Sequence, residues 1–171
     1  YFQNKKDTLV GTVYTNSALE ELLKRRNINL VRAQVGDKKV YKQMCENNSI
    51  LGGEDSGHII LKTHSNTGDG ILISIIIANI IKITGKTLNE LLEGYHEHFQ
   101  ARANLKVCAN FKISATIIEK IKEFEKHDAR IIIRPSGTEP VLRVFVEHKE
   151  KEIAENCLMS LTEEINKVCL L

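Results

Sequence analysis

The polar segment at residues 134–140 separates two apolar runs, at 131–133 and 141–146. Such runs are typical of β-strands, so the segment is expected to form a hairpin loop. A guanidinium can bind two phosphate oxygens at once, and backbone N–H groups beside a glycine can converge on an anion. The candidate phosphate-binding residues are therefore Arg134, Ser136, Gly137, Thr138 and Arg143. A surface turn with a solvated arginine is the alternative interpretation.

A second polar loop, at residues 52–58, combines three glycines with two carboxylates, a serine and a histidine. Carboxylates accept hydrogen bonds from the hydroxyls of a sugar, and glycines let the backbone approach such a ligand closely. The candidate sugar-binding residues are Glu54, Ser56, Gly57 and His58. An acidic turn leading into a strand is the alternative. A third polar segment, at 67–70, is interpreted as a helix cap.

The composition excludes several classes of protein. The chain has 171 residues and a formal net charge of +2, and 5% of its residues are aromatic. This balance offers neither the basic surface nor the stacking platforms of a nucleic-acid-binding protein. The longest apolar run, at 71–83, has the length of a buried core helix and is too short to span a bilayer, so no membrane partner is expected. The four cysteines are scattered, and we expect a cytoplasmic protein with reduced thiols.

Strands alternate with helices in the first part of the chain, which predicts a mixed-sheet α/β domain over residues 1–98. Strands are expected at 8–14, 28–35 and 58–61, and helices from residues 17, 37 and 70. The glycine-rich segment at 52–57 is expected to be a loop. Three pairs of residues have the spacing of a capping box: Ser17 with Glu20, Thr87 with Glu90, and Thr116 with Glu119.

From residue 99 onward the order of elements changes. The sequence predicts a strand at 105–111, a helix from residue 116, the two strands around the 134–140 loop, and a final helix at 150–168. This order predicts a small sheet covered by helices. We therefore expect a second, C-terminal domain over residues 99–171.

The two polar loops and their surroundings resemble those of the α-D-phosphohexomutases. The run from Arg134 to Arg143 is similar to the phosphate-binding loop of that family's C-terminal domain, and the run from Gly53 to His58 is similar to its sugar-binding loop. Three further segments, at 12–20, 35–37 and 67–70, are most similar to the phosphoglucosamine mutase branch. The resemblance covers nearly the whole chain in the right order. It departs from the family at Asp55, where glutamine is usual, and at Tyr14-Thr15, where Met-Ser is usual.

The resemblance implies an enzyme of four domains, of which this chain holds most of the third and all of the fourth. Such an enzyme isomerises glucosamine 6-phosphate to glucosamine 1-phosphate through a bisphosphate, and so supplies UDP-N-acetylglucosamine and cell-wall precursors. The family's phosphoserine and the aspartates that hold its Mg²⁺ belong to earlier domains. We therefore expect the chain by itself to bind no metal, to lack a catalytic residue of its own apart from the acid/base candidate His58, and to be inactive.

The resemblance also implies partners: a phosphosugar substrate and the N-terminal domains of the same polypeptide. Two alternatives remain open from the sequence. The parent enzyme could be a phosphomannomutase or phosphoglucomutase of the same superfamily, because no residue here must recognise the amine at C2. The chain could also be a non-catalytic phosphosugar-binding module.

Overall fold

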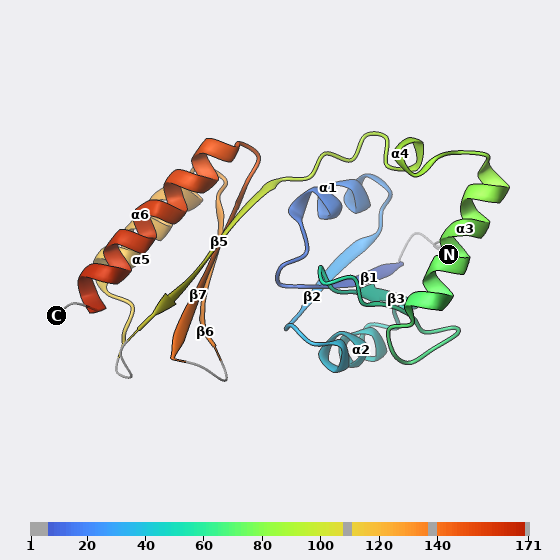
Figure 1. The fold of residues 1–171 in the computed structure, drawn as a ribbon, viewed down its shortest axis with the longest axis horizontal. Coiled ribbons are helices and arrows are strands. Elements are labelled where there is room, and N and C mark those ends of the chain that lie inside the picture. The colour runs from blue at the N-terminus through green and yellow to red at the C-terminus, as the bar shows by residue number, and fades with distance from the viewer. Residues whose placement is uncertain (1–6, 108–110, 137–139, 170–171) are drawn as a thin grey trace. The chain divides into compact units, whose positions relative to one another are not determined.

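The computed structural model describes residues 7–107, 111–136 and 140–169. The chain forms two compact units, Tyr1–Glu97 and His98–Leu171. The first unit combines helices with a mixed sheet, and the second packs helices on an antiparallel sheet (Figure 1). This architecture confirms the fold class expected from the sequence.

The first unit opens with four strands and two helices: β1 (Thr8–Thr12), α1 (Ser17–Arg25), β2 (Asn29–Ala33), α2 (Asp37–Glu46), β3 (Leu51–Gly53) and β4 (Ile59–Leu61). The strand order in the sheet is β2-β1-β3-β4. β1 lies parallel to β2 and to β3, whereas β3 and β4 pair antiparallel. The helices α1 and α2 are therefore the crossover connections between parallel strands.

α2 packs on one face of this sheet through a small apolar core. Val40 and Met44 of α2 are fully buried with Val10 of β1 and Ile60 of β4. Gly52 of β3 lies against them, because a Cβ at this position would come within 2.6 Å of the Met44 sulfur. The expectation that Gly52 belongs to a loop was wrong, since the close approach of the helix requires a strand residue without a side chain.

α3 (Gly70–Thr84) and α4 (Leu88–Leu91) complete the first unit. Asp69 caps α3 by accepting a hydrogen bond from Leu72 N, and Gly85 ends it in the left-handed conformation at φ 66°. Both ends lie close to where the sequence predicts them. However, no residue of α3 is buried, unlike the core helix that its composition indicates. Among the described residues, no helix has both the length and the apolar character needed to cross a bilayer.

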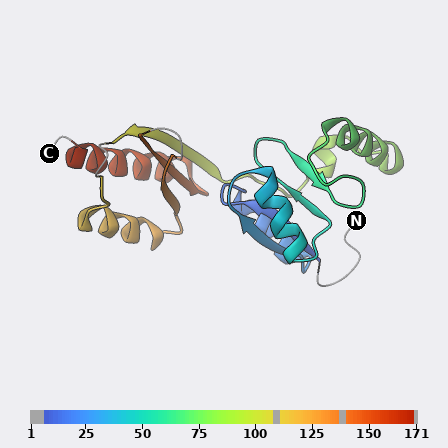
Figure 2. The same cartoon turned by 90° about the horizontal axis from the view of Figure 1, so that it is seen from below.

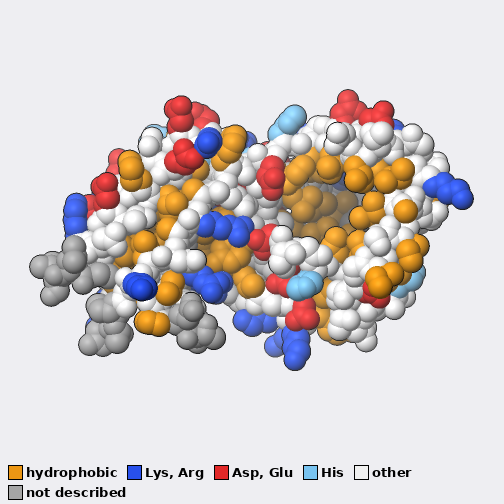
Figure 3. Space-filling view, viewed as in Figure 1, with side chains coloured by type: hydrophobic (Ala, Val, Ile, Leu, Met, Phe, Trp, Pro, Cys, Tyr) orange, Lys and Arg blue, Asp and Glu red, His pale blue; other side chains and the backbone are white. Residues whose placement is uncertain are grey.

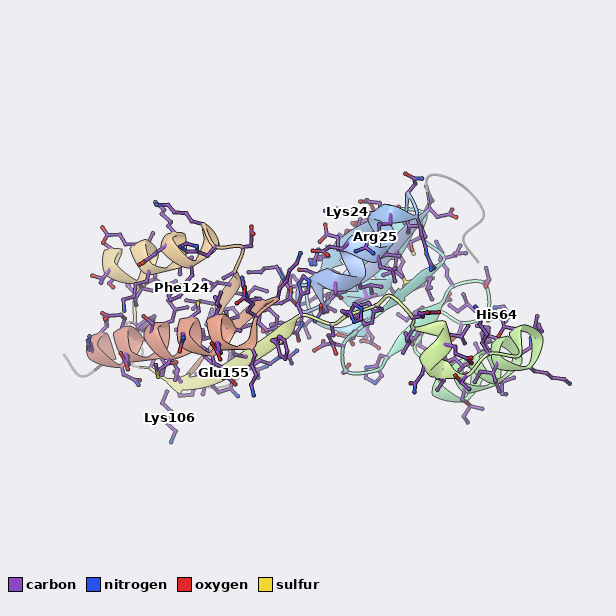
Figure 4. The ribbon with its side chains drawn as sticks, turned by 90° about the horizontal axis from the view of Figure 1, so that it is seen from above. Lys24, Arg25, His64, Lys106, Phe124 and Glu155 are labelled. Carbon is purple, nitrogen blue, oxygen red and sulfur yellow. The ribbon has the colours of Figure 1, made fainter. Side chains whose placement is uncertain are left out.

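The second unit contains β5 (Phe99–Lys106), α5 (Ala115–Glu125), β6 (Arg130–Pro135), β7 (Val141–His148) and α6 (Lys151–Cys169). β7 is the central strand and pairs antiparallel with both β5 and β6. Both helices cover the same face of this sheet (Figure 2). Phe124 points from α5 toward α6, while Lys106 projects from β5 away from the helices (Figure 4).

The core of the second unit lies between β7 and its two helices. Alternate residues of β7 and residues of both helices at helical spacing form it: Leu142, Val144, Val146, Ile117, Ala154, Cys157, Leu161 and Ile165. The inward positions of α5 and α6 agree with the apolar stripes in the sequence. This packing leaves the other face of the sheet uncovered by either helix.

The first strand of the second unit differs from its prediction. It was expected at residues 105–111, whereas β5 spans Phe99–Lys106. Ala101 and Leu105 pack toward the core, and the residues between them on the opposite face are polar. A strand of alternating small and polar residues contains no apolar run, so the search for such runs missed it.

Only one of the three expected capping boxes forms. Thr87 and Glu90 make both reciprocal hydrogen bonds at the start of α4. α1 is capped instead by the side chain of Asn16, and α5 by that of Ser114. In both cases a good capping residue precedes the expected one, so the predicted cap lies inside the helix.

Cys45 of the first unit and Cys157 of the second unit should differ sharply in reactivity. Burial raises the pKa of the Cys157 thiol to about 12, whereas Cys45 is exposed. Because the thiolate is the nucleophile, a maleimide at about pH 8 should label Cys45 and spare Cys157 in the folded chain. Peptide mass spectrometry would measure this, with denatured chain as the control in which both react. Rapid labelling of Cys157 in the folded chain would mean that the packing of α6 on the sheet does not protect its thiol.

Candidate substrate-binding site

Two candidate phosphate-binding residues face each other across β6 and β7. Arg134 and Arg143 are directly opposite in the strand register, so their side chains share one face of the sheet. Leu142 and Val144, on either side of Arg143, belong to the core under the helices, which places both arginines on the uncovered face. Like charges directly opposite one another destabilise a strand pair. An anion held between them would convert that repulsion into attraction.

Ser136 follows at the end of β6, where its backbone N–H donates to Val141 O at 2.7 Å. Its hydroxyl oxygen is buried and has no hydrogen-bond partner among the described residues. Buried polar atoms nearly always have a partner, so the hydroxyl of Ser136 is available to donate to an acceptor outside the described residues. The remaining candidates of this loop, Gly137 and Thr138, lie outside the described residues.

Four residues further along β6 and β7, a polar network lies on the same face of the sheet. Glu147 is 1% exposed, and its carboxylate accepts from Arg130 Nε at 3.0 Å and from Gln100 Nε2 at 2.6 Å. The guanidinium groups of Arg130 and Arg102 lie over the Phe145 ring, 5.0 and 5.4 Å from its centre. The Glu147 carboxylate thus joins Arg130 to Gln100 on this face of the sheet. Lys and Arg side chains gather over the strands of the second unit (Figure 3).

Sequence reasoning missed one neighbour of the arginine pair. Asn104 of β5 is directly opposite Arg143 on the other side of the central strand. Asn104, Arg143 and Arg134 therefore form one polar row across all three strands. The alternation of polar residues from Gln100 to Lys106 was the available signal, and it was lost when the strand was placed too late in the sequence.

The candidate sugar-binding residues form a short closed loop after β3. Glu54 N donates to His58 O at 2.9 Å, and Gly57 N donates to Glu54 O at 3.1 Å. Gly57 has φ 94°, a conformation that glycine adopts without strain. Ser56 is exposed, and the His58 side chain is 65% exposed. These groups can therefore contact a ligand without rearrangement of the loop.

Glu54 has a different environment from its neighbours in the loop. Its side chain is only 8% exposed, and its Oε1 accepts from Gly36 N at 2.7 Å. Its Oε2 lies 3.4 Å from His58 Nδ1. The structure thus brings together two segments that stood out in the sequence, 35–37 and 53–58. The carboxylate is held by one oxygen at the start of α2 and can offer the other to a ligand.

The described residues provide no ligand set for the Mg²⁺ that the resemblance implies. They contain no group of three or more His, Cys, Asp or Glu side chains arranged to hold a metal ion. Asp37 begins α2, Asp55 follows β3 and Asp69 caps α3. These carboxylates belong to separate loops, and we assign no step to a metal here.

Two family models match the chain. The model for phosphoglucomutase/phosphomannomutase, alpha/beta/alpha domain III, matches residues 1–99. The model for the phosphoglucomutase/phosphomannomutase C-terminal domain matches residues 85–164. Together they extend over both compact units.

Curated relatives and solved structures agree with these models. The chain is 39% identical over 163 residues to phosphoglucosamine mutase of Thermotoga petrophila and 41% identical over 169 residues to that of Lactobacillus gasseri. These matches cover 95% and 96% of the chain but 37% of each relative, so the chain spans little more than a third of their length. A structure of Aspergillus fumigatus N-acetylphosphoglucosamine mutase matches 96% of the chain and 39% of its own, with a TM-score of 0.80 at 18% identity, which shows a shared fold.

The Glu54 contact predicts a measurable local effect. The substitution Glu54→Gln keeps an oxygen that can accept from Gly36 N but removes the negative charge of the carboxylate. The free energy of local unfolding around Gly36 should therefore fall by about 1 kcal/mol. The amide of Gly36 should then exchange its hydrogen several-fold faster. Native-state hydrogen exchange would measure this, with Glu93→Gln at an exposed position as the matched control. Equal exchange in both variants would show that the hydrogen bond is not formed in solution.

Proposed function

Because the chain belongs to the phosphoglucomutase/phosphomannomutase family, we propose that it is the substrate-recognition part of a phosphoglucosamine mutase. The parent enzyme would interconvert glucosamine 6-phosphate and glucosamine 1-phosphate through a bisphosphate. Relatives of that name are 39–41% identical to the chain, which supports this substrate over other hexose phosphates. In this proposal residues 1–98 correspond to domain III and residues 99–171 to domain IV of a cytoplasmic enzyme.

The observation that carries the proposal is the pairing of Arg134 with Arg143 near Ser136, whose buried hydroxyl has no hydrogen-bond partner among the described residues. A phosphate can accept from two guanidinium groups and a hydroxyl at once, and charge-assisted hydrogen bonds of this type are the strong ones. Gly137 and Thr138 would complete the loop through their backbone N–H groups and a second hydroxyl. This group of residues would hold the phosphate that is not reacting.

The first unit would recognise the ring hydroxyls. Ser56 and His58 are accessible, and Glu54 has one carboxylate oxygen fixed by Gly36 N and a second facing His58. A carboxylate held in this way can accept from two adjacent hydroxyls with little loss of side-chain freedom. His58 would contact substrate or transfer a proton. Gly57 lets the backbone approach the ring.

The two groups of residues suit a reaction in which the sugar binds in two opposite orientations. Phosphoryl transfer depends mainly on positioning and on stabilisation of charge. One phosphate site and one group of residues that bind the ring hydroxyls would serve either orientation of the sugar, whichever phosphate is reacting. The phosphoserine and the Mg²⁺ would come from other parts of a longer polypeptide. The 171-residue chain would recognise substrate and catalyse nothing, while its parent would feed UDP-N-acetylglucosamine and cell-wall precursor synthesis.

The phosphate site can be tested on the chain itself. Glucosamine 6-phosphate should shift the amide NMR signals of Ser136 and Arg143, with weak affinity. Arg134→Ala should weaken this binding by about 1.5–3 kcal/mol, or roughly ten- to a hundredfold, because it removes a charge-assisted hydrogen bond. Arg25→Ala, at an exposed position on α1, is the matched control and should leave the affinity unchanged. An unaltered affinity in Arg134→Ala would mean that this guanidinium does not contact phosphate.

Substrate identity needs the longer enzyme. Turnover of glucosamine phosphates should exceed that of glucose and mannose phosphates when they compete for the same preparation. Preference for a neutral hexose would favour a phosphoglucomutase or phosphomannomutase. Binding without turnover by the longer protein would favour a non-catalytic module.

A further inference from the structure

The end of β5 lies beside the residues that lead into and out of the 134–140 segment. Its pairing with β7 places Lys106 opposite Val141, the residue with which β7 begins. Just beyond the strand, Val107 N donates to Pro140 O at 3.2 Å. The segment that is proposed to bind phosphate therefore has β5 as a neighbour, in addition to the two strands that it connects.

The side chains of Asn104 and Lys106 lie on the same face of the sheet as the arginine pair. Leu105, between them in the chain, packs against the core under the helices, so its two neighbours point to the uncovered face. Figure 4 shows Lys106 directed away from α5 and α6. Both side chains are exposed. A ligand on this face can therefore reach them without displacing a packed side chain.

Two adjacent rows across the three strands contain the polar groups near this segment: Asn104, Arg143 and Arg134 in one row, and Lys106, Val141 and Ser136 in the next. Lys106 is the diagonal neighbour of Arg143. Diagonal neighbours on one face of an antiparallel pair are about 7–8 Å apart, which long side chains can span. The Lys106 ammonium and the Arg143 guanidinium can therefore contact the same phosphate group.

The positive charges at this end of the face have no carboxylate to balance them. Neither Lys106 nor Arg143 forms an ion pair with any residue in the part of the chain that the structure describes. The Glu147 carboxylate lies on the same face but is bound by Arg130, with 3.0 Å between the carboxylate oxygen and Nε. Two neighbouring cations without a counter-charge form a place where an anion is stabilised.

The second cation of β5 on this face is used differently. The Arg102 guanidinium lies over the Phe145 ring, 5.4 Å from its centre, and its Nη2 donates to Gln100 Oε1 at 3.0 Å. Both contacts direct it toward the row of Gln100 and Glu147, away from Arg143. Lys106 has no such contact among the described residues, so it is the lysine and not the arginine of β5 that serves the arginine pair.

We propose that Asn104 and Lys106 belong to the phosphate site, so that β5 contributes an amide and a third cation to it. The inference rests on the proposed function, because the phosphate is the one assigned there to Arg134 and Arg143. The Lys106 ammonium donates to one phosphate oxygen and the Asn104 side-chain N–H to another.

This set of donors selects a phosphate monoester. Such a group has three terminal oxygens and close to two negative charges at neutral pH. A phosphodiester has one negative charge and two terminal oxygens, so it leaves part of the site without an acceptor. The contribution of β5 is therefore a preference for the terminal phosphate of a sugar over a bridging one.

Changing the charge at Lys106 tests its part in the site. Lys106→Gln should weaken the binding of glucosamine 6-phosphate to the 171-residue chain roughly tenfold, the effect of losing one charge-assisted hydrogen bond. Lys106→Arg should retain most of the affinity, because the positive charge stays in place. Lys122→Gln, at an exposed position on α5, is the matched control and should leave the affinity unchanged. NMR titration measures all three variants.

Asn104 is tested by a substitution that separates binding from stability. Asn104→Asp should weaken phosphate binding at least about tenfold, because a carboxylate repels the ligand and pairs with Arg143. The unfolding midpoint should change little, because this cross-strand pair offsets the poorer strand propensity of aspartate. In the unaltered chain, inorganic phosphate should shift the NMR signals of the Asn104 side-chain amide, and glucosamine without phosphate should not.

Three results would overturn the inference. An unchanged affinity in Lys106→Gln, with Arg134→Ala still weakened, would leave the phosphate site in place and show that the lysine only protects an edge strand from pairing with other chains. Equal weakening in Lys106→Gln and Lys122→Gln would indicate an effect of overall charge and not a contact. An unchanged affinity in both Lys106→Gln and Arg134→Ala would refute the proposed phosphate site together with the contribution of β5.

Discussion

The pairing of β6 with β7 is the constraint on which the second unit depends. Because side chains alternate along a strand, a single register sends Leu142, Val144 and Val146 into the core and Arg143, Phe145 and Glu147 to the other face. A shift of one residue would bury arginines under α6 and expose the core. The energy of apolar burial on one side thus fixes the positions of charges on the other, and it holds Arg134 and Arg143 together despite their repulsion.

The first unit uses a different interaction for a similar purpose. Its loops at 35–37 and 53–58 belong to different strand–helix connections, and the hydrogen bond from Gly36 N to the Glu54 carboxylate joins them. The acceptor is charged and mostly buried, so the bond is stronger than a neutral one and costly to break. The loop is therefore shaped before any ligand arrives, while Ser56 and His58 stay accessible.

Much of this arrangement could be predicted from the sequence. Hydrophobic periodicity predicts the apolar stripes of α5 and α6 and the strands around the 134–140 segment. The aspartate and glycine at its ends predict the limits of α3. The pattern also drew attention to Arg134, Ser136 and Glu54, whose roles remain proposals. It did not reveal Gly52 as a strand residue, because only the approach of Met44 requires it. It also missed β5 and Asn104, since that strand gains its stability from pairing with β7 and not from its own apolar residues.

The central position of β7 has a consequence for how the second unit is made. β5 and β6 do not pair with each other, so neither can join a sheet until residues 141–148 have been synthesised. The paired residues of β5 and β7 are between about 35 and 49 positions apart in the sequence, so the chain closes a long loop late in synthesis. During translation the earlier strands would leave the ribosome without a partner, and α5 alone could form locally. The polar row of Asn104, Arg143 and Arg134 would thus be assembled only after β7 is made, and a chain released before residue 141 would lack the sheet of the second unit.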